Sequence, residues 1–177
     1  MTTTSPLRAP DVFMWQAIEL ASRNRTRPFA AVIVDKTTEL TVATGLNRVN
    51  EHPLWHAEID AINHLTTGGN YDPRSLTLFS TAEPCPMCFS AILWSGIQSV
   101  VFGTDIERLV ELGWRQIEVT SDELLSRSPE FNFYIAGGVL REECDPLRRR
   151  PRHDSVVRPE PLRTCRSGWA AQKSRVL

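Results

Sequence analysis

Residues 75–104 read SLTLFSTAEPCPMCFSAILWSGIQSVVFGT, and this stretch decides the fold class. It begins with a strand-like apolar run at 75–81, continues with a helical pattern at 85–96, and ends with a β-branched run at 98–104. Gly96 suits the end of the helix, because glycine readily adopts the backbone conformation that closes helices. A strand, a helix and a strand in close succession are typical of an α/β domain.

The flanking segments extend this alternation of helices and strands. Further strands are expected at 29–35, 40–46 and 131–138, and helices at 11–23, 56–65, 105–113, 121–128 and 140–150. Expected core residues are Val12, Met14, Trp15, Ile18, Ala21, Ile59, Ile62, Leu65, Trp94, Trp114, Phe133 and Cys144. The short KTTE link between the first two strands predicts a hairpin. This order of elements predicts an α/β domain with one mixed sheet between layers of helices.

Composition indicates one globular domain followed by a basic tail. The chain has 177 residues, of which 41% are hydrophobic and 23% charged, as in ordinary globular proteins. Residues 1–146 carry eleven basic and nineteen acidic side chains, whereas residues 147–177 carry nine basic and two acidic ones. We expect 1–146 to form the domain and 147–177, which lacks hydrophobic periodicity, to be disordered. No signal peptide or membrane span is evident, so we expect a cytoplasmic location.

Cys85 and Cys88 lie three residues apart, a spacing that suits a redox pair, a metal site or simple burial. Four cysteines without a signal peptide do not indicate a disulfide framework. In the first turn of a helix, the unpaired N–H groups and the helix dipole favour thiolates, and this spacing places both sulfurs on one face. Two thiolates and an imidazole suit zinc, and a catalytic zinc leaves its fourth position open.

The segment WHAEI supplies the missing imidazole and a carboxylate. His56 and Glu58 would each be unremarkable alone, as a helix-start histidine and a solvated first-turn acid. Together, H-x-E followed by P-C-x-x-C is the pattern of zinc deaminases that act on nucleobases. A redox pair would need no histidine. A closed structural zinc site in a binding module would need His52 or His64 as a fourth ligand and would leave Glu58 without a role.

The chain resembles the cytidine/deoxycytidylate deaminase-like superfamily of zinc enzymes over about residues 10–145. The resemblance rests on PFAAVIV (28–34), TGLNRV (44–49), HAEIDAI (56–62), STAEPCPMCFSAILWSGI (80–97) and VVFGT (100–104). Within the superfamily, the chain is most similar to the branch of small guanine deaminases and tRNA adenosine deaminases. The resemblance implies a three-layer α/β/α sandwich with a mixed five-stranded sheet, a bound Zn²⁺ and a homodimer.

The resemblance also implies roles for individual residues. The implied zinc ligands are His56, Cys85 and Cys88, and the implied contacts to the base are Asn47, Phe29 and the backbone around Ala57 and Glu58. Glu58 would move protons from water to the ring and to the departing ammonia, so that a carbonyl replaces the exocyclic amine.

Two positions depart from the guanine deaminase pattern. Those enzymes carry an acidic residue that assists proton transfer, whereas this chain reads GWRQIE and places Gln116 there. Glutamine forms hydrogen bonds but does not shuttle a proton, so Glu118, Asp122 or Glu123 would have to replace the acid. Trp55 stands where a small residue is usual, and it would either stack on a flat base or pack in the core.

We therefore expect a hydrolytic deaminase of a nucleobase or nucleoside, with a guanine-like purine favoured. A tRNA adenosine deaminase is the alternative, because GGVLREEC and the basic tail resemble that branch. The acidic loop DIERLVELG, which lacks the lysine usual there, and the acidic domain argue against a polyanionic substrate. A deaminase of cytosine or another aminated heterocycle is a third possibility.

Overall fold

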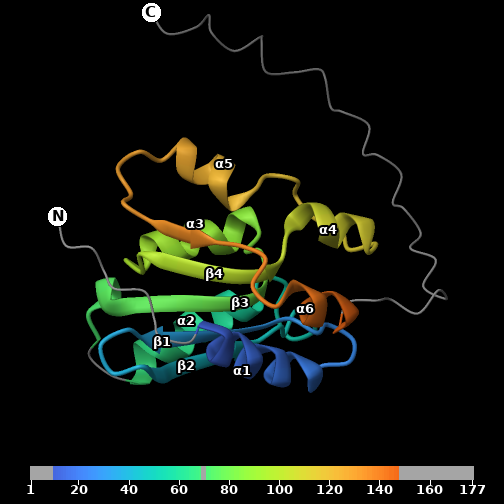
Figure 1. The fold of residues 1–177 in the computed structure, drawn as a ribbon, viewed down its shortest axis with the longest axis horizontal. Coiled ribbons are helices and arrows are strands. Elements are labelled where there is room, and N and C mark those ends of the chain that lie inside the picture. The colour runs from blue at the N-terminus through green and yellow to red at the C-terminus, as the bar shows by residue number, and fades with distance from the viewer. Residues whose placement is uncertain (1–9, 69–70, 148–177) are drawn as a thin grey trace, which may run out of the picture.

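Five strands form one mixed sheet in the computed structural model, which describes residues 10–68 and 71–147 (Figure 1). The strands are β1 (Ala30–Asp35), β2 (Leu40–Leu46), β3 (Leu76–Ala82), β4 (Ser99–Thr104) and β5 (Tyr134–Ala136). The helices are α1 (Pro10–Ser22), α2 (Ala57–Gly68), α3 (Pro86–Trp94), α4 (Ile106–Glu111), α5 (Ser121–Ser126) and α6 (Arg141–Leu147), and η1 (Pro73–Ser75) is a 3₁₀ turn. The predicted disordered tail lies outside the described residues except for Leu147, so that boundary stays a prediction.

The sheet has the order β2-β1-β3-β4-β5. β1 pairs antiparallel with both β2 and β3, whereas β3, β4 and β5 run parallel. The predicted hairpin and the predicted mixed five-stranded sheet are therefore confirmed. β1, β3 and β4 are almost entirely buried, which explains why their sequences read as continuous apolar runs.

Helices cover both faces of the sheet, as predicted (Figure 1). Val32, Val34 and Phe79 point toward α1 and α6, where they form one apolar cluster. Their neighbours Ile33 and Leu78 point to the opposite face, in a cluster with residues of α2 and α3. This alternation follows from the two-residue period of a strand, and it makes the three-layer sandwich. Within the described residues, no helix has the length and apolar character needed to span a bilayer.

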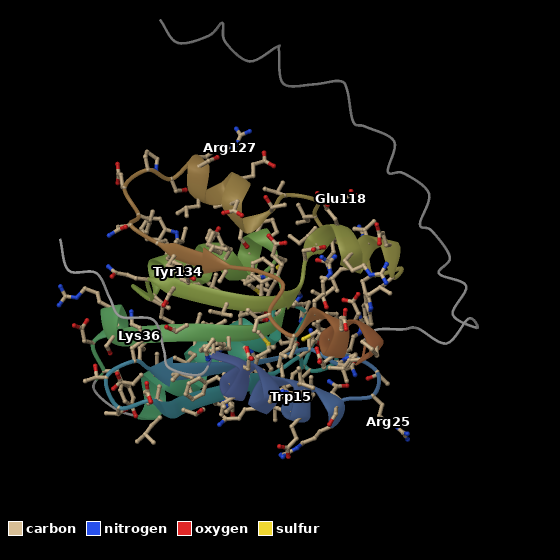
Figure 2. The ribbon with its side chains drawn as sticks, viewed as in Figure 1. Trp15, Arg25, Lys36, Glu118, Arg127 and Tyr134 are labelled. Atoms are coloured by element: carbon tan, nitrogen blue, oxygen red, sulfur yellow. The ribbon has the colours of Figure 1, made fainter. Side chains whose placement is uncertain are left out.

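Several predicted core positions are wrong. Val12 and Trp15 are 52% and 49% exposed, and Trp15 lies on the outer side of α1 (Figure 2). The stripe of α1 that packs on the sheet consists of Phe13, Met14, Ala17, Ile18 and Ala21. Met14, Ile18 and Ala21 of this stripe were predicted, whereas Phe13 and Ala17 were not, because apolar residues occur on both faces of α1.

Two other predictions of burial also need correction. Trp94, at the end of α3, is 81% exposed, and its ring lies perpendicular to the Phe131 ring. In α2 the buried apolar residues are Ala57, Ala61 and Leu65. Ile62 is half-buried and packs against the core as predicted, whereas Ile59 is half-buried. Trp114 and Cys144 are buried, as predicted, and Phe133 packs half-buried against the core.

Close packing of α2 on β2 places the start of α2 at the end of the sheet where β2 and β3 terminate. A Cβ atom at Gly45 would overlap the Ala57 carbonyl oxygen and the Ala61 nitrogen, so only glycine fits there. α3 contacts α2 and begins just after the end of β3. The first residues of the two helices therefore meet beyond the C-terminal ends of β2 and β3.

Candidate active site

His56, Cys85 and Cys88 bring one nitrogen and two sulfurs within 4.8 Å of one another. The His56 Nδ1 atom lies 3.6 Å from the Cys85 Sγ atom. Ordinary zinc–nitrogen and zinc–sulfur bond lengths at a tetrahedral angle set a nitrogen–sulfur separation of about 3.6 Å. The spacing and the donor set therefore fit a zinc ion held by three protein ligands, which leaves a fourth position open.

Two helix starts hold these ligands. His56 directly precedes α2, and its carbonyl oxygen accepts a hydrogen bond from the Asp60 N–H (2.9 Å). Cys85 is the capping residue of α3 and has extended backbone geometry, and Pro86 occupies the first turn. Because His56 lies just before the regular helix, its side chain and that of Glu58 reach the same pocket despite their two-residue spacing.

The ligands polarise one another even as free side chains. A hydrogen bond from Cys88 lowers the pKa of Cys85 to about 4, and the same bond raises the pKa of Cys88. The hydrogen bond with Cys85 also raises the pKa of His56, against the opposing effect of burial. These shifts favour the thiolate form of Cys85 and the thiol form of Cys88, whose proton a metal ion must displace.

Glu58 is the buried carboxyl group beside this cluster. It is 6% exposed, and its Oε1 atom accepts a hydrogen bond from the Ser80 hydroxyl (2.9 Å). Burial is the largest influence on Glu58 and raises the pKa of its carboxyl group. A carboxyl group with a raised pKa can both accept and return a proton near neutral pH.

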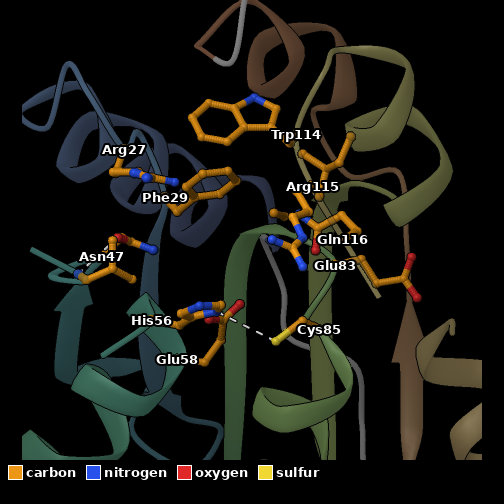
Figure 3. A pocket seen from close by; sticks show the side chains of 13 residues that line it. Arg27, Phe29, Asn47, His56, Glu58, Glu83, Cys85, Trp114, Arg115 and Gln116 are labelled. Atoms are coloured by element: carbon orange, nitrogen blue, oxygen red, sulfur yellow. Dashed lines mark hydrogen bonds between the residues drawn. The ribbon is translucent and has the colours of Figure 1, made fainter. Parts of the chain in front are cut away.

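A pocket of about 110 Å³ opens above these residues. His56, Glu58 and Cys85 lie at its base, and Arg27 and Arg115 lie above them on opposite sides (Figure 3). The Phe29 and Trp114 rings also line it, and they meet edge to face with their centres 4.8 Å apart. An apolar wall of aromatic rings suits a substrate with an aromatic ring.

Asn47 adds a polar group to the pocket wall. Its backbone N–H donates to the Phe29 carbonyl oxygen (3.0 Å), continuing the pairing of β2 with β1. Its side-chain Oδ1 accepts from the Val49 N–H (3.3 Å), so the Nδ2 group is the part left to donate to a ligand.

The structure places most, but not all, of the predicted substrate-binding residues at the pocket. Gln116, Asn47 and Phe29 line it, whereas Ala57 and Trp55 do not. The Trp55 ring instead lies under the Arg48 guanidinium, 4.7 Å from its centre, and beside the His52 ring.

The acids considered as substitutes at position 116 do not reach the pocket either. Glu118, Asp122 and Glu123 are exposed and do not line it. None of these three acids therefore supplies a carboxylate beside Gln116.

Sequence reasoning missed Glu83, which lines the pocket and binds the two helix starts on either side of residues 114–116. Glu83 is buried, and its carboxylate accepts from the Ile106 N–H (2.9 Å) and the Ser121 N–H (2.7 Å). It thereby joins the first residues of α4 and α5, between which Trp114, Arg115 and Gln116 lie. The available signal was an acid inside an otherwise apolar stretch, two residues before Cys85.

Curated relatives with similar sequences are nucleobase or tRNA deaminases. A tRNA-specific adenosine deaminase from Haemophilus influenzae is 35% identical over 137 residues, which are 74% of this chain and 76% of that protein. A probable cytosine deaminase from Schizosaccharomyces pombe is 34% identical over 116 residues, 63% of this chain and 70% of that protein.

Among solved structures, the guanine deaminase from Nitrosomonas europaea is similar, with a TM-score of 0.69 and 27% identity over 81% of this chain and 84% of that one. Residues 8–104 match the family model of the cytidine and deoxycytidylate deaminase zinc-binding region. This match contains the three clustered ligands and Glu58, and it stops before the pocket wall at 114–116. The chain therefore belongs to the family of zinc-dependent deaminases defined by this cytidine and deoxycytidylate deaminase zinc-binding region.

Proposed function

We propose that the protein hydrolyses the exocyclic amine of a guanine-like purine, as a base or in a nucleoside, to a carbonyl group and ammonia. One observation carries the proposal. The buried Glu58 carboxyl group lies beside a cluster of three ligands, at the base of a pocket with an aromatic wall. A closed structural metal site would need a fourth ligand, and in the described part of the chain the cluster contains only His56, Cys85 and Cys88.

Glu58 is the proton carrier in this proposal. A zinc ion held by His56, Cys85 and Cys88 would supply a Lewis acid that lowers the pKa of water to about 7. The Ser80 hydroxyl positions the Glu58 carboxyl group, which takes the proton of the attacking water. Glu58 delivers protons to a ring nitrogen and then to the departing amine, so that water and the amine yield a carbonyl group and ammonia.

Other residues of the pocket orient the ring. Phe29 and Trp114 provide an apolar wall, and the Asn47 Nδ2 group donates to an oxygen or nitrogen acceptor on the ring edge. Gln116 offers one donor and one acceptor from the facing wall. We include Asn47, Phe29 and Gln116 in the substrate site, and we leave out Trp55 because Arg48 and His52 cover its ring.

A tRNA adenosine deaminase is the second candidate. It is supported by the 35% identity with the Haemophilus influenzae enzyme over 137 residues. The eight-charge acidic excess of residues 1–146, nineteen acidic against eleven basic side chains, disfavours a polyanion, and for this reason we favour a small substrate.

Ammonia release from a panel of compounds tests the choice. The zinc-loaded protein is assayed on guanine, guanosine, adenine, cytosine and a tRNA anticodon stem-loop. We expect the highest kcat/KM on a purine base or nucleoside. The highest value on the stem-loop would establish the second candidate instead, and no release from any compound would refute deamination.

We further propose a homodimer in the cytoplasm. The two thiol ligands need a compartment that keeps them reduced, which favours the cytoplasm. Light scattering at several protein concentrations tests the dimer.

A further inference from the structure

Two guanidinium groups line the upper part of the pocket. Arg27 belongs to the segment between α1 and β1, and Arg115 to the segment between α4 and α5. They approach the pocket from opposite sides, above Glu58 and His56 (Figure 3). A base seated near Glu58 would therefore have a positive charge on each side of the part that extends toward solvent.

No carboxylate neutralises either cation within the described residues. The ion pairs there involve other arginines, and neither the Arg27 nor the Arg115 side chain forms a hydrogen bond. Glu83 also lines the pocket, but both of its oxygens accept backbone N–H groups. Gln116, next to Arg115, is neutral.

Hydrogen bonds hold the backbone of Arg27 at the rim of the pocket. Its backbone N–H donates to the Asn24 side-chain oxygen (3.0 Å), and its carbonyl oxygen accepts from the Phe29 N–H (2.7 Å). The Asn24 amide in turn donates to the Asn47 carbonyl oxygen (2.9 Å). Arg27 as a residue is half-buried, and its guanidinium lies 5.8 Å from the centre of the Trp114 ring. A partly desolvated cation without an acidic partner is costly unless a ligand supplies the charge.

We propose that Arg27 and Arg115 bind a phosphate monoester carried by the substrate, so that the preferred substrate is a purine nucleoside monophosphate. This inference rests on the proposed deaminase function and narrows its substrate class. Guanidinium groups pair with phosphate oxygens through two parallel hydrogen bonds. A phosphate monoester carries a charge of about −1.5 to −2 at pH 7, which matches two arginines better than the single charge of a carboxylate or a phosphodiester.

Turnover of matched compounds tests the phosphate site. The values of kcat/KM for guanosine and guanosine 5′-monophosphate, and for the adenosine pair, are measured with the zinc-loaded full chain. We expect the monophosphate to exceed its nucleoside by about 10–100-fold, as the loss of one hydrogen bond to a charged group implies. Arg27→Gln and Arg115→Gln should each remove most of this preference, by raising KM for the monophosphate. Arg25→Gln is the matched control, because Arg25 is exposed in the same loop and does not line the pocket.

Calorimetric binding separates this inference from the proposed function, since it needs no turnover. Tighter binding of guanosine 5′-monophosphate than of guanosine, lost in Arg27→Gln but kept in Arg25→Gln, would support the phosphate site even if no ammonia were released. Equal binding and turnover of the two compounds would overturn the phosphate site while leaving deamination standing. A preference for the tRNA stem-loop that both arginine variants abolish would overturn the small-molecule assignment and assign the pair to RNA.

Discussion

Replacing Glu83 by glutamine should loosen the pocket wall without touching the metal ligands. The carboxylate accepts two N–H groups, from Ile106 at 2.9 Å and Ser121 at 2.7 Å. A glutamine side chain has one carbonyl oxygen, so its NH₂ group must face one of these N–H groups, donor against donor. The variant also loses a negative charge at the starts of α4 and α5, where the helix dipoles favour one.

The expected loss of stability follows from these contacts. One hydrogen bond to a charged group contributes about 1.5–3 kcal/mol, and a charge at a helix start about 0.3–1 kcal/mol for each helix. The free energy of unfolding should therefore fall by roughly 2–5 kcal/mol, which lowers the Tm of a protein of this size by roughly 4–20 °C. Residues 114–116 of the pocket wall connect α4 to α5, so a shift of either helix should displace them. We therefore expect kcat/KM to fall by up to about 100-fold, mainly through a raised KM.

Thermal unfolding and steady-state kinetics measure both effects. Glu118→Gln is the matched control, since Glu118 is an exposed acid in the same segment and does not line the pocket. If Glu83→Gln unfolds at the same temperature as Glu118→Gln and has an unchanged KM, the carboxylate does not hold the wall. A loss confined to kcat would instead place Glu83 in the chemistry itself.

Three other substitutions test separate parts of the account. Gly45→Ala should displace α2, lower the free energy of unfolding by about 1–3 kcal/mol and reduce zinc content. Thr44→Ala, at an exposed neighbouring position, should have none of these effects, and equal melting temperatures of the two variants would contradict this. Cys85→Ser should lower zinc content well below the one ion per chain expected of the unaltered protein, and undiminished zinc by metal analysis would refute its role as a ligand. Gln116→Glu should raise kcat/KM for guanine by about 10–100-fold, because a carboxylate accepts hydrogen bonds from the amino-imine edge of guanine that an amide satisfies only in part. Unchanged turnover of every purine would refute a pocket-wall role for this position.

The base of the pocket could be predicted from sequence because its chemistry is local. His56 and Glu58 lie two residues apart at one helix start, and Cys85 and Cys88 lie three apart at another. That the two helix starts lie next to each other depends on the fold. The family resemblance supplied this expectation, since the sequence pattern alone does not show it.

The pocket wall escaped sequence reasoning because it depends on contacts between distant segments. Glu83 joins α4 to α5 across 23 and 38 residues, and no local pattern marks such a carboxylate. Trp114 was expected in the core and is buried, but its ring also faces the pocket. Trp55 was a candidate to stack on the base because of its flat ring, but the Arg48 guanidinium stacks on that ring instead.

The direction of α1 was misjudged for a different reason. Hydrophobic periodicity predicted Val12 and Trp15 in the core, whereas the packed stripe contains Phe13 and Ala17 instead. Periodicity locates a helix more reliably than it identifies the buried face when apolar residues lie on both sides.

The most direct test of the central claim is ammonia release by zinc-loaded Glu58→Ala, measured on the best substrate of the panel. The account predicts that kcat falls by about 10²–10⁴-fold, because a general acid–base group is lost, while zinc content stays that of the unaltered protein. Glu118→Ala, which removes an exposed acid, should keep full activity. If Glu58→Ala retains its zinc and turns over within a few-fold of the unaltered protein, Glu58 is not the proton carrier and the proposed mechanism is wrong.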